Sequence, residues 1–199
     1  MGAVTDPVTI DELRAAVAAD PENAEFTARG WTPVFAASPA SRIVLVGQAP
    51  GAKAQASGMP FTDASGVALL EWLGVDEATF RDPDRFAILP MDFYFPGRGR
   101  SGDALPGRGF AARWHPPLLA LMPEVRLTLL VGATAQEHYL GDRRRANLTE
   151  TVRAFRAYLP SEFPLVHPSP RTIPWQAHHP WFREEVLPEL RAEVRRALA

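Results

Sequence analysis

Short apolar runs alternate with helical patterns along this chain, and this alternation restricts the possible folds more than any other feature. Four of the runs have the length and composition of buried strands. The predicted strands are residues 43–46, 86–89, 127–131 and 163–166. The first predicted helix begins at Thr9 or Asp11 and ends near Asp20. The other predicted helices are residues 64–73, 110–122, 133–140, 149–159 and 181–198. Alternating strands and helices imply parallel strands joined by right-handed crossovers. We therefore expect an α/β fold, a three-layer α/β/α sandwich with a central four-stranded parallel sheet, in a single domain over residues 1–199.

Composition excludes several classes of protein. None of the apolar runs approaches the roughly 18 residues of a membrane-spanning helix, and the first residues lack the pattern of a signal peptide. We therefore expect a cytoplasmic protein with no membrane partner. The absence of cysteine rules out disulfides, thiolate nucleophiles and iron–sulfur clusters. A net charge of −2 requires that any contact with nucleic acid come from a local basic patch.

The segments that follow the predicted strands are the expected ligand-binding segments. In an open parallel sheet, ligands bind outside the carboxyl ends of the strands. These segments are residues 47–58, 90–108, 132–135 and 167–175. Three of them are rich in glycine, proline, histidine or arginine, and two are too long to be simple connections. Their composition favours a functional site at this edge.

The first segment begins Gly47-Gln48-Ala49-Pro50-Gly51. A strand that runs into this pattern makes a tight turn, which aims backbone N–H groups into the cleft. Such donors suit an anion or an oxygen that gains charge during a reaction. The pattern lacks the residues of a phosphate-binding loop or a dinucleotide fold, and by itself it is also compatible with an ordinary turn.

Two further elements carry candidate ligand contacts. Phe61 lies on a loop stiffened by Pro60, where its ring is suited to stacking on a base or to packing on the core. His167 directly follows the last predicted strand, and Pro168 and Pro170 hold its loop extended. A histidine fixed in this way can donate a hydrogen bond at little entropic cost; the alternative is a structural histidine.

Together these elements resemble the uracil-DNA glycosylase superfamily. The motif at residues 47–51 and His167-Pro168-Ser169-Pro170 match its two signatures in order and spacing, and the resemblance extends from about residue 43 to 171. Residues 47–51 and the continuation 58–70 are most similar to the thermostable, iron–sulfur branch. This chain lacks the four cysteines of that branch, so the cluster cannot form here.

Two positions depart from the family pattern. The aspartate that activates water in the best-known branch would fall at Ala49. An asparagine that reads uracil would fall at Pro90 or Met91, and Asp92 is the nearest polar residue. An ionised aspartate would repel the O4 atom of uracil and accept from an amino group or a ring N–H. The pocket is therefore expected to prefer a base other than uracil.

The resemblance implies a monofunctional DNA glycosylase that hydrolyses the N-glycosidic bond of a flipped-out uracil or other damaged base. His167 and the N–H groups of Gln48 and Ala49 would donate to the departing base. The base would contact Gly47, Phe61 and Asp92, and the expected DNA contacts are Ser169, Arg171, Arg98 and Arg100, with Thr172 and Ile173 as a wedge. We expect a monomer without a cofactor or metal, whose partner is DNA containing a modified base.

Other functions stay open. One alternative is a protein of the same fold that binds nucleic acid or a nucleobase with little or no catalysis, and another is an enzyme acting on small nucleotides. His178-His179-Pro180 matches no metal-binding spacing that we can justify, and Ser169 lacks the G-x-S-x-G pattern of a serine hydrolase. The run Arg143–Arg145 is expected to be a solvated turn.

Overall fold

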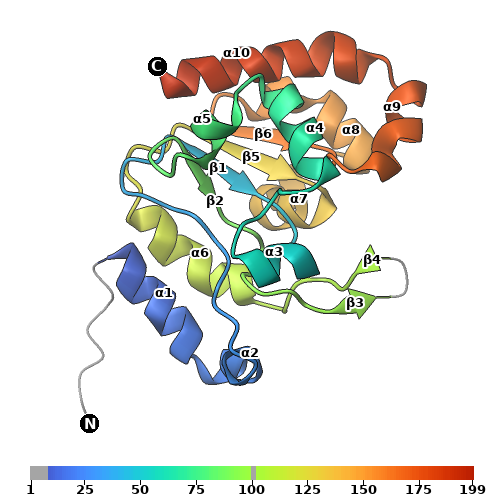
Figure 1. Ribbon diagram of the computed structural model, residues 1–199. Coiled ribbons are helices and arrows are strands. Elements are labelled where there is room, and N and C mark those ends of the chain that lie inside the picture. Colours follow the sequence, from blue (N-terminus) through green and yellow to red (C-terminus); the bar gives the residue numbers. More distant parts are fainter. Residues whose placement is uncertain (1–8, 100–101) are drawn as a thin grey trace.

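A four-stranded parallel sheet forms the centre of the computed structural model, which describes residues 9–99 and 102–199 (Figure 1). The strand order is β2-β1-β5-β6, and every neighbouring pair is parallel. The strands are β1 (Ile43–Val46), β2 (Phe86–Ile88), β5 (Leu127–Val131) and β6 (Glu162–Leu165). All four residues of β1 are fully buried, as a central strand covered on both faces requires. The predicted three-layer sandwich is confirmed.

Alternate residues of the strands enter two separate cores. Ile43 and Leu45 of β1 pack with Leu69 and Trp72 of one helical layer. Val44 and Val46 point to the other core, because successive side chains of a strand face opposite ways. The first layer contains α4 (Ala64–Leu73), α5 (Glu77–Arg81), α8 (Leu148–Arg153) and α10 (Leu187–Leu198), and the second contains α1 (Ile10–Ala19), α6 (Phe110–Ala120) and α7 (Ala133–Leu140) (Figure 1).

The ends of several helices follow from local chemistry. Thr9 caps α1 in a capping box with Glu12, and Asp63 caps α4 by accepting from Ser65 and Gly66. The remaining helices are short, and the sequence patterns did not reveal them. They are α2 (Ala24–Ala28), α3 (Ala52–Ser57) and α9 (Ile173–His178).

Two predicted helices are interrupted. The helix expected over 149–159 ends at Arg153 and continues as a 3-10 turn, Phe155–Tyr158. Phe155 packs in one core and Tyr158 in the other, whereas residues three apart in an α-helix share a face. The last helix begins with a π-helical turn, Phe182–Val186. Pro188, which cannot donate a backbone hydrogen bond, lies two residues after the end of this turn.

The ends of two strands also differ from prediction. β6 lies one residue earlier than expected because its register with β5 ends at Val131 and Leu165. Pro164 is tolerated because β6 is an edge strand. At the other edge, β2 ends at Ile88, although the N–H of Leu89 still donates to the carbonyl of Leu45.

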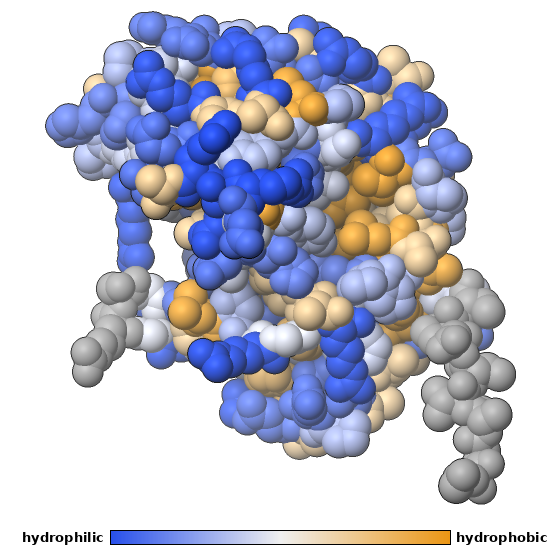
Figure 2. All heavy atoms as spheres, turned by 180° about the vertical axis from the view of Figure 1, so that it is seen from behind, coloured by the Kyte–Doolittle hydropathy of each residue, from blue (hydrophilic) through white to orange (hydrophobic). Residues whose placement is uncertain are grey.

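A small hairpin extends beyond the carboxyl ends of the strands. It consists of β3 (Arg98–Gly99) and β4 (Gly102–Asp103), which pair antiparallel. In Figure 1 the hairpin projects from the same side as α3 and α9. From behind, the surface is largely hydrophilic, with hydrophobic side chains gathered toward one side (Figure 2). Within residues 9–99 and 102–199, no helix has both the length and the apolar character needed to cross a membrane.

Candidate nucleobase-binding site

A cavity of about 340 Å³ lies at the carboxyl ends of β1, β2 and β6. It brings together segments that are far apart in the sequence. Its lining consists of residues 47–54 after β1, residues 60–63 and Ser65 before and in α4, Pro90 after β2, Arg98 and Asp103 of the hairpin, and His167 after β6. The two motifs of the sequence therefore face one cavity, and Gly47, Gln48, Ala49, Phe61, Arg98 and His167 all line it.

The loop after β1 is fixed through its carbonyl groups. The carbonyls of Gly47 and Gln48 accept from the N–H groups of Met91 (2.8 Å) and Asp92 (3.3 Å). The side chain of Gln48 donates to the carbonyl of Ala104 at 3.0 Å. The backbone N–H groups of Gln48 and Ala49 donate to no acceptor in the part of the chain that the structure describes. The turn is thus held from one side while two adjacent donors stay available to a ligand.

Phe61 occupies a conformation that few residues adopt. Its φ angle is 57°, the only positive φ among the described residues other than glycine, and such a conformation costs about 1–3 kcal/mol. Arg81 holds it by donating to the carbonyl oxygens of Pro60 (2.6 Å) and Phe61 (2.9 Å). The ring lies over Gly47, with its Cζ atom 3.7 Å from the position of a Cβ atom there. The strained backbone therefore places an aromatic ring in the wall of the cavity.

His167 contributes a neutral imidazole. Burial lowers the pKa of His167, and the negative charge of Asp63 opposes this shift only in part. The carbonyl of His167 accepts from the hydroxyl of Thr172 at 3.0 Å, which fixes the loop. Neither ring nitrogen has a hydrogen-bond partner within residues 9–99 and 102–199. A neutral ring with unengaged nitrogens can donate one hydrogen bond to a ligand.

The wall formed by the segment after β2 differs from the sequence-based expectation. Pro90 lines the cavity, and its carbonyl accepts from Nε2 of the buried His115 at 2.9 Å. Asp92 is only 4% exposed and lies outside the cavity lining. Its carboxylate accepts from the N–H groups of Tyr94 and Gly107, each at 3.0 Å. Asp92 thus organises the loop, and its position gives no support to the predicted contact with a base.

Three charged residues of the lining were missed in the sequence analysis. They are Lys53, Asp63 and Asp103. Lys53 and Asp63 lie within the segments that carry the first motif and Phe61, so their proximity to those residues was the available signal. Asp103 lies in a hairpin whose strands are two residues long, which is too short to produce a strand pattern.

The predicted DNA contacts are distributed around the cavity. Arg98 is in the lining, and a guanidinium nitrogen of Arg171 lies 3.0 Å from the Cβ position of Gly102, so the histidine loop reaches the hairpin. The carbonyl of Ser169 accepts from Thr172, both from its N–H and from its hydroxyl. Arg100 lies outside the described residues.

Four large apolar side chains among the described residues are exposed to solvent, and none of them is part of the cavity lining. In the described part of the chain, the exposed large hydrophobic residues are Met59 (51% exposed), Val67 (72%), Leu105 (74%) and Ile173 (61%). Ile173, the predicted wedge, is therefore available for contact with a ligand.

The two adjacent histidines have local partners. A ring nitrogen of His178 bonds to the carbonyl of Pro174, and one of His179 bonds to the carbonyl of Trp175, each at 2.7 Å. Among residues 9–99 and 102–199, no three or more histidine, aspartate or glutamate side chains form a group suited to a metal ion.

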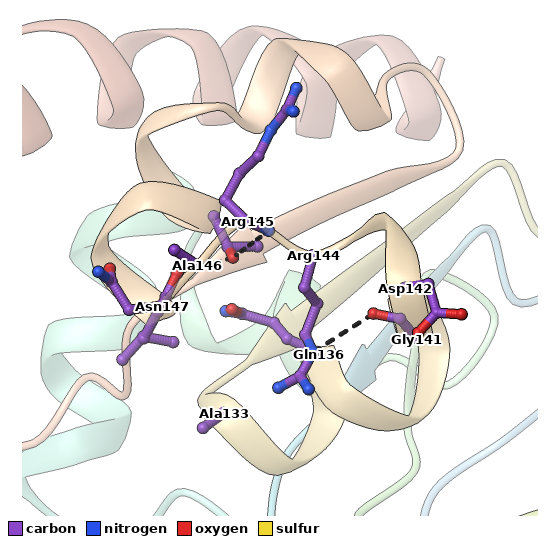
Figure 3. A pocket seen from close by; sticks show the side chains of 10 residues that line it. Ala133, Gln136, Gly141, Asp142, Arg144, Arg145, Ala146 and Asn147 are labelled. Carbon is purple, nitrogen blue, oxygen red and sulfur yellow. Dashed lines mark hydrogen bonds between the residues drawn. The ribbon is translucent and has the colours of Figure 1, made fainter.

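A second polar cavity, of about 310 Å³, lies between α7 and α8 (Figure 3). None of the predicted site residues lines it. Arg144 bonds to the carbonyl of Gly141, and the N–H of Arg145 donates to Thr151. Arg143 pairs with Glu162. The arginine run is therefore engaged in local contacts on this side of the molecule.

Comparison with known proteins identifies the family of this chain. The family model of the uracil DNA glycosylase superfamily matches residues 35–191. The chain belongs to the uracil DNA glycosylase superfamily. A solution NMR structure of a proposed uracil DNA glycosylase from Methanosarcina acetivorans is similar at 11% identity, with a TM-score of 0.46, and the match covers 80% of this chain and 94% of that one.

Proposed function

We propose that this protein is a DNA glycosylase that hydrolyses the N-glycosidic bond of a damaged base flipped out of DNA. One observation carries the proposal. His167, Gln48, Ala49 and Phe61, which come from three separate segments of the chain, all line one cavity. Its volume of about 340 Å³ falls in the range of small-ligand pockets.

The donors in the cavity fit the charge that develops in this reaction. As the glycosidic bond lengthens, the sugar becomes cationic and the departing base becomes anionic. Fixed donors that meet this negative charge lower the barrier, since they need no reorganisation during the step. His167 donates to the base from a neutral ring, and the unengaged N–H groups of Gln48 and Ala49 donate to the same side. Phe61 stacks on the face of the base.

The rim of the cavity fits a nucleotide that leaves a duplex. Extruding a base from the duplex costs a few kcal/mol of free energy, and this cost is lowest for a mispaired base. Apolar side chains that enter the stack offset part of this cost, and Ile173 is exposed beside the histidine loop. Arg98, on the hairpin, contacts the phosphate backbone. We expect the protein to act as a monomer on DNA.

The cavity wall after β2 lacks the amide side chain that reads uracil in relatives. Pro90 presents no side-chain hydrogen-bonding group to the cavity, and the carboxylate of Asp92 is engaged elsewhere. Residues 90 and 92 therefore supply no side-chain contact specific to uracil. Hypoxanthine, xanthine and hydroxymethyluracil are the other substrates to compare.

A cleavage assay on oligonucleotides tests the proposal. Each strand carries uracil, hypoxanthine, xanthine or hydroxymethyluracil, and abasic sites are revealed by alkaline cleavage. We expect the protein to cleave at least one of the four lesion-containing strands. His167→Ala should slow this cleavage about 10²–10³-fold, as the loss of one hydrogen-bond donor to a developing negative charge does in other enzymes. His178→Ala, a histidine outside the cavity lining, is the matched control and retains activity. Failure to cleave any of the four lesions defeats the proposal.

A second candidate function rests on a specific observation. Ala49 stands where the best-known branch of the family has an aspartate, and Pro90 or Met91 stands where relatives commonly have an asparagine. None of these residues has an acidic or amide side chain. A protein that binds a flipped base or nucleic acid without efficient catalysis is compatible with this lining. Stable binding of lesion-containing duplex without turnover supports this candidate, and multiple turnovers exclude it.

A further inference from the structure

The hairpin formed by β3 and β4 places a carboxylate over the first motif. Asp103 ends β4 and lines the same cavity as His167. Its Oδ2 atom lies 3.6 Å from the position that a Cβ atom would take at Gly51. The carboxylate therefore reaches the motif from a segment more than fifty residues away in sequence, next to a residue that has no side chain.

The position of Asp103 is restrained by two hydrogen bonds of the residue that follows it. The N–H of the following residue, Ala104, donates to the carbonyl of Gly97 at 2.9 Å and closes the base of the hairpin. The carbonyl of Ala104 accepts from the side chain of Gln48 at 3.0 Å, which ties the hairpin to the motif itself. Gln48 thus holds the hairpin and the motif at a constant separation, with Asp103 between them.

Within the part of the chain that the structure describes, the carboxylate of Asp103 has no competing partner. It makes no hydrogen bond or ion pair with any of residues 9–99 and 102–199, although Arg98 lies opposite it in the hairpin register. The other carboxylate of the lining, Asp63, is already engaged, because its Oδ1 atom caps α4 through Ser65 and Gly66. Of the two acids, Asp103 is the one whose carboxylate oxygens both lack a partner among the described residues.

We propose that Asp103 is the catalytic carboxylate of this site, supplied by the hairpin in place of the acid that Ala49 lacks. The inference rests on the proposed glycosylase function. The bond from the sugar C1′ to the base nitrogen breaks, and its electron pair leaves with the base. Asp103 stabilises the resulting sugar cation and orients a water molecule. The water oxygen bonds to C1′, its proton passes to Asp103, and from there it returns to solvent or to the departing base.

Two measurements on full-length protein test this role. The first is the single-turnover cleavage rate on the best substrate of the lesion series. The second is the affinity for duplex carrying a cationic pyrrolidine abasic analogue compared with the neutral tetrahydrofuran analogue, which requires no cleavage. Three variants are compared, Asp103→Asn, Asp63→Asn and Asp142→Asn. Asparagine preserves side-chain shape, and at residue 63 it also preserves the helix cap. Asp142, which lines the other cavity, is the matched control.

We expect Asp103→Asn to slow cleavage by about 100-fold or more, as loss of a general base does. Its preference for the cationic analogue should fall by about tenfold or more, since a charge pair near a protein surface is worth that much. Asp142→Asn should match the wild type. The inference is overturned if Asp103→Asn is indistinguishable from wild type in both measurements, or if the losses occur in Asp63→Asn alone. If the wild-type protein cleaves none of the lesions, the proposed function is refuted. The comparison of the two abasic analogues then still tests whether Asp103 faces the sugar cation, because it requires no cleavage.

Discussion

The backbone of Phe61 lies directly against Gly66 in the first turn of α4. A Cβ atom at residue 66 would overlap the carbonyl oxygen of Phe61 and would lie 2.7 Å from its carbonyl carbon. Only glycine allows this approach. The close packing explains how a residue in a left-handed conformation is held in place, because α4 and Arg81 restrain the same carbonyl group. The stacking face of the cavity therefore depends on a residue that does not line it.

Replacing Gly66 with alanine should displace Phe61. We expect a loss of stability of about 1–3 kcal/mol, as in other overpacked sites, and a reduced affinity for lesion-containing DNA. Urea unfolding and fluorescence anisotropy measure the two effects. Val67→Ala, at a residue that is 72% exposed, is the control for stability and should change it by less than about 0.5 kcal/mol. An unaltered affinity in Gly66→Ala would show that the position of Phe61 is unimportant for binding.

The buried His115 should make stability depend on pH. Burial lowers the pKa of His115 to about 4, and the carbonyl of Pro90 opposes this shift only in part. Between pH 6.5 and 4 the unfolded chain binds a proton at this residue that the folded chain does not, so stability falls as the pH falls. The full loss is roughly 3 kcal/mol, from about 1.4 kcal/mol for each unit of the shift.

Urea unfolding at pH 7, 5.5 and 4.5 measures this dependence. His115→Gln removes the titrating group and should flatten the pH dependence, although it lowers stability at pH 7 because the bonds to Pro90 and Tyr139 are altered. His178→Ala, at an exposed residue, should retain the wild-type slope. If the slope persists in His115→Gln, another group is responsible for it.

Ile173 should matter for duplex DNA and much less for single strands. A duplex must be unstacked before its base enters the cavity, at a cost of a few kcal/mol per step, whereas a single strand needs little unstacking. We expect Ile173→Ala to weaken binding of a lesion-containing duplex by about tenfold, equivalent to 1.4 kcal/mol, relative to the single strand. Competition anisotropy with both substrates gives the ratio. Ile173→Leu retains an apolar side chain and should restore it, and an equal loss on both substrates would argue against a wedge.

Much of the fold followed from the sequence because its signals are local. Strand β1 and helices α4 and α7 have the predicted boundaries, since apolar periodicity and capping residues such as Asp63 act over a few residues. The interruption at Phe155 was not predictable in this way. It reflects which of two cores each aromatic ring enters, and that choice is made by the assembled sheet.

The candidate site, too, was predicted from the sequence only in part. The sequence by itself determined that the loops around Gln48 and His167 face one cavity, because the carboxyl ends of parallel strands meet at one edge of a sheet. Only the tertiary structure decided the roles of the acids: Asp92 points into the loop as an acceptor for Tyr94 and Gly107, while Asp103 reaches Gly51 from a hairpin. Motif spacing shows where residues lie along the chain. The direction of a carboxylate depends on its neighbours in space, here backbone N–H groups and a glycine, and these come from distant segments that only the tertiary structure brings together.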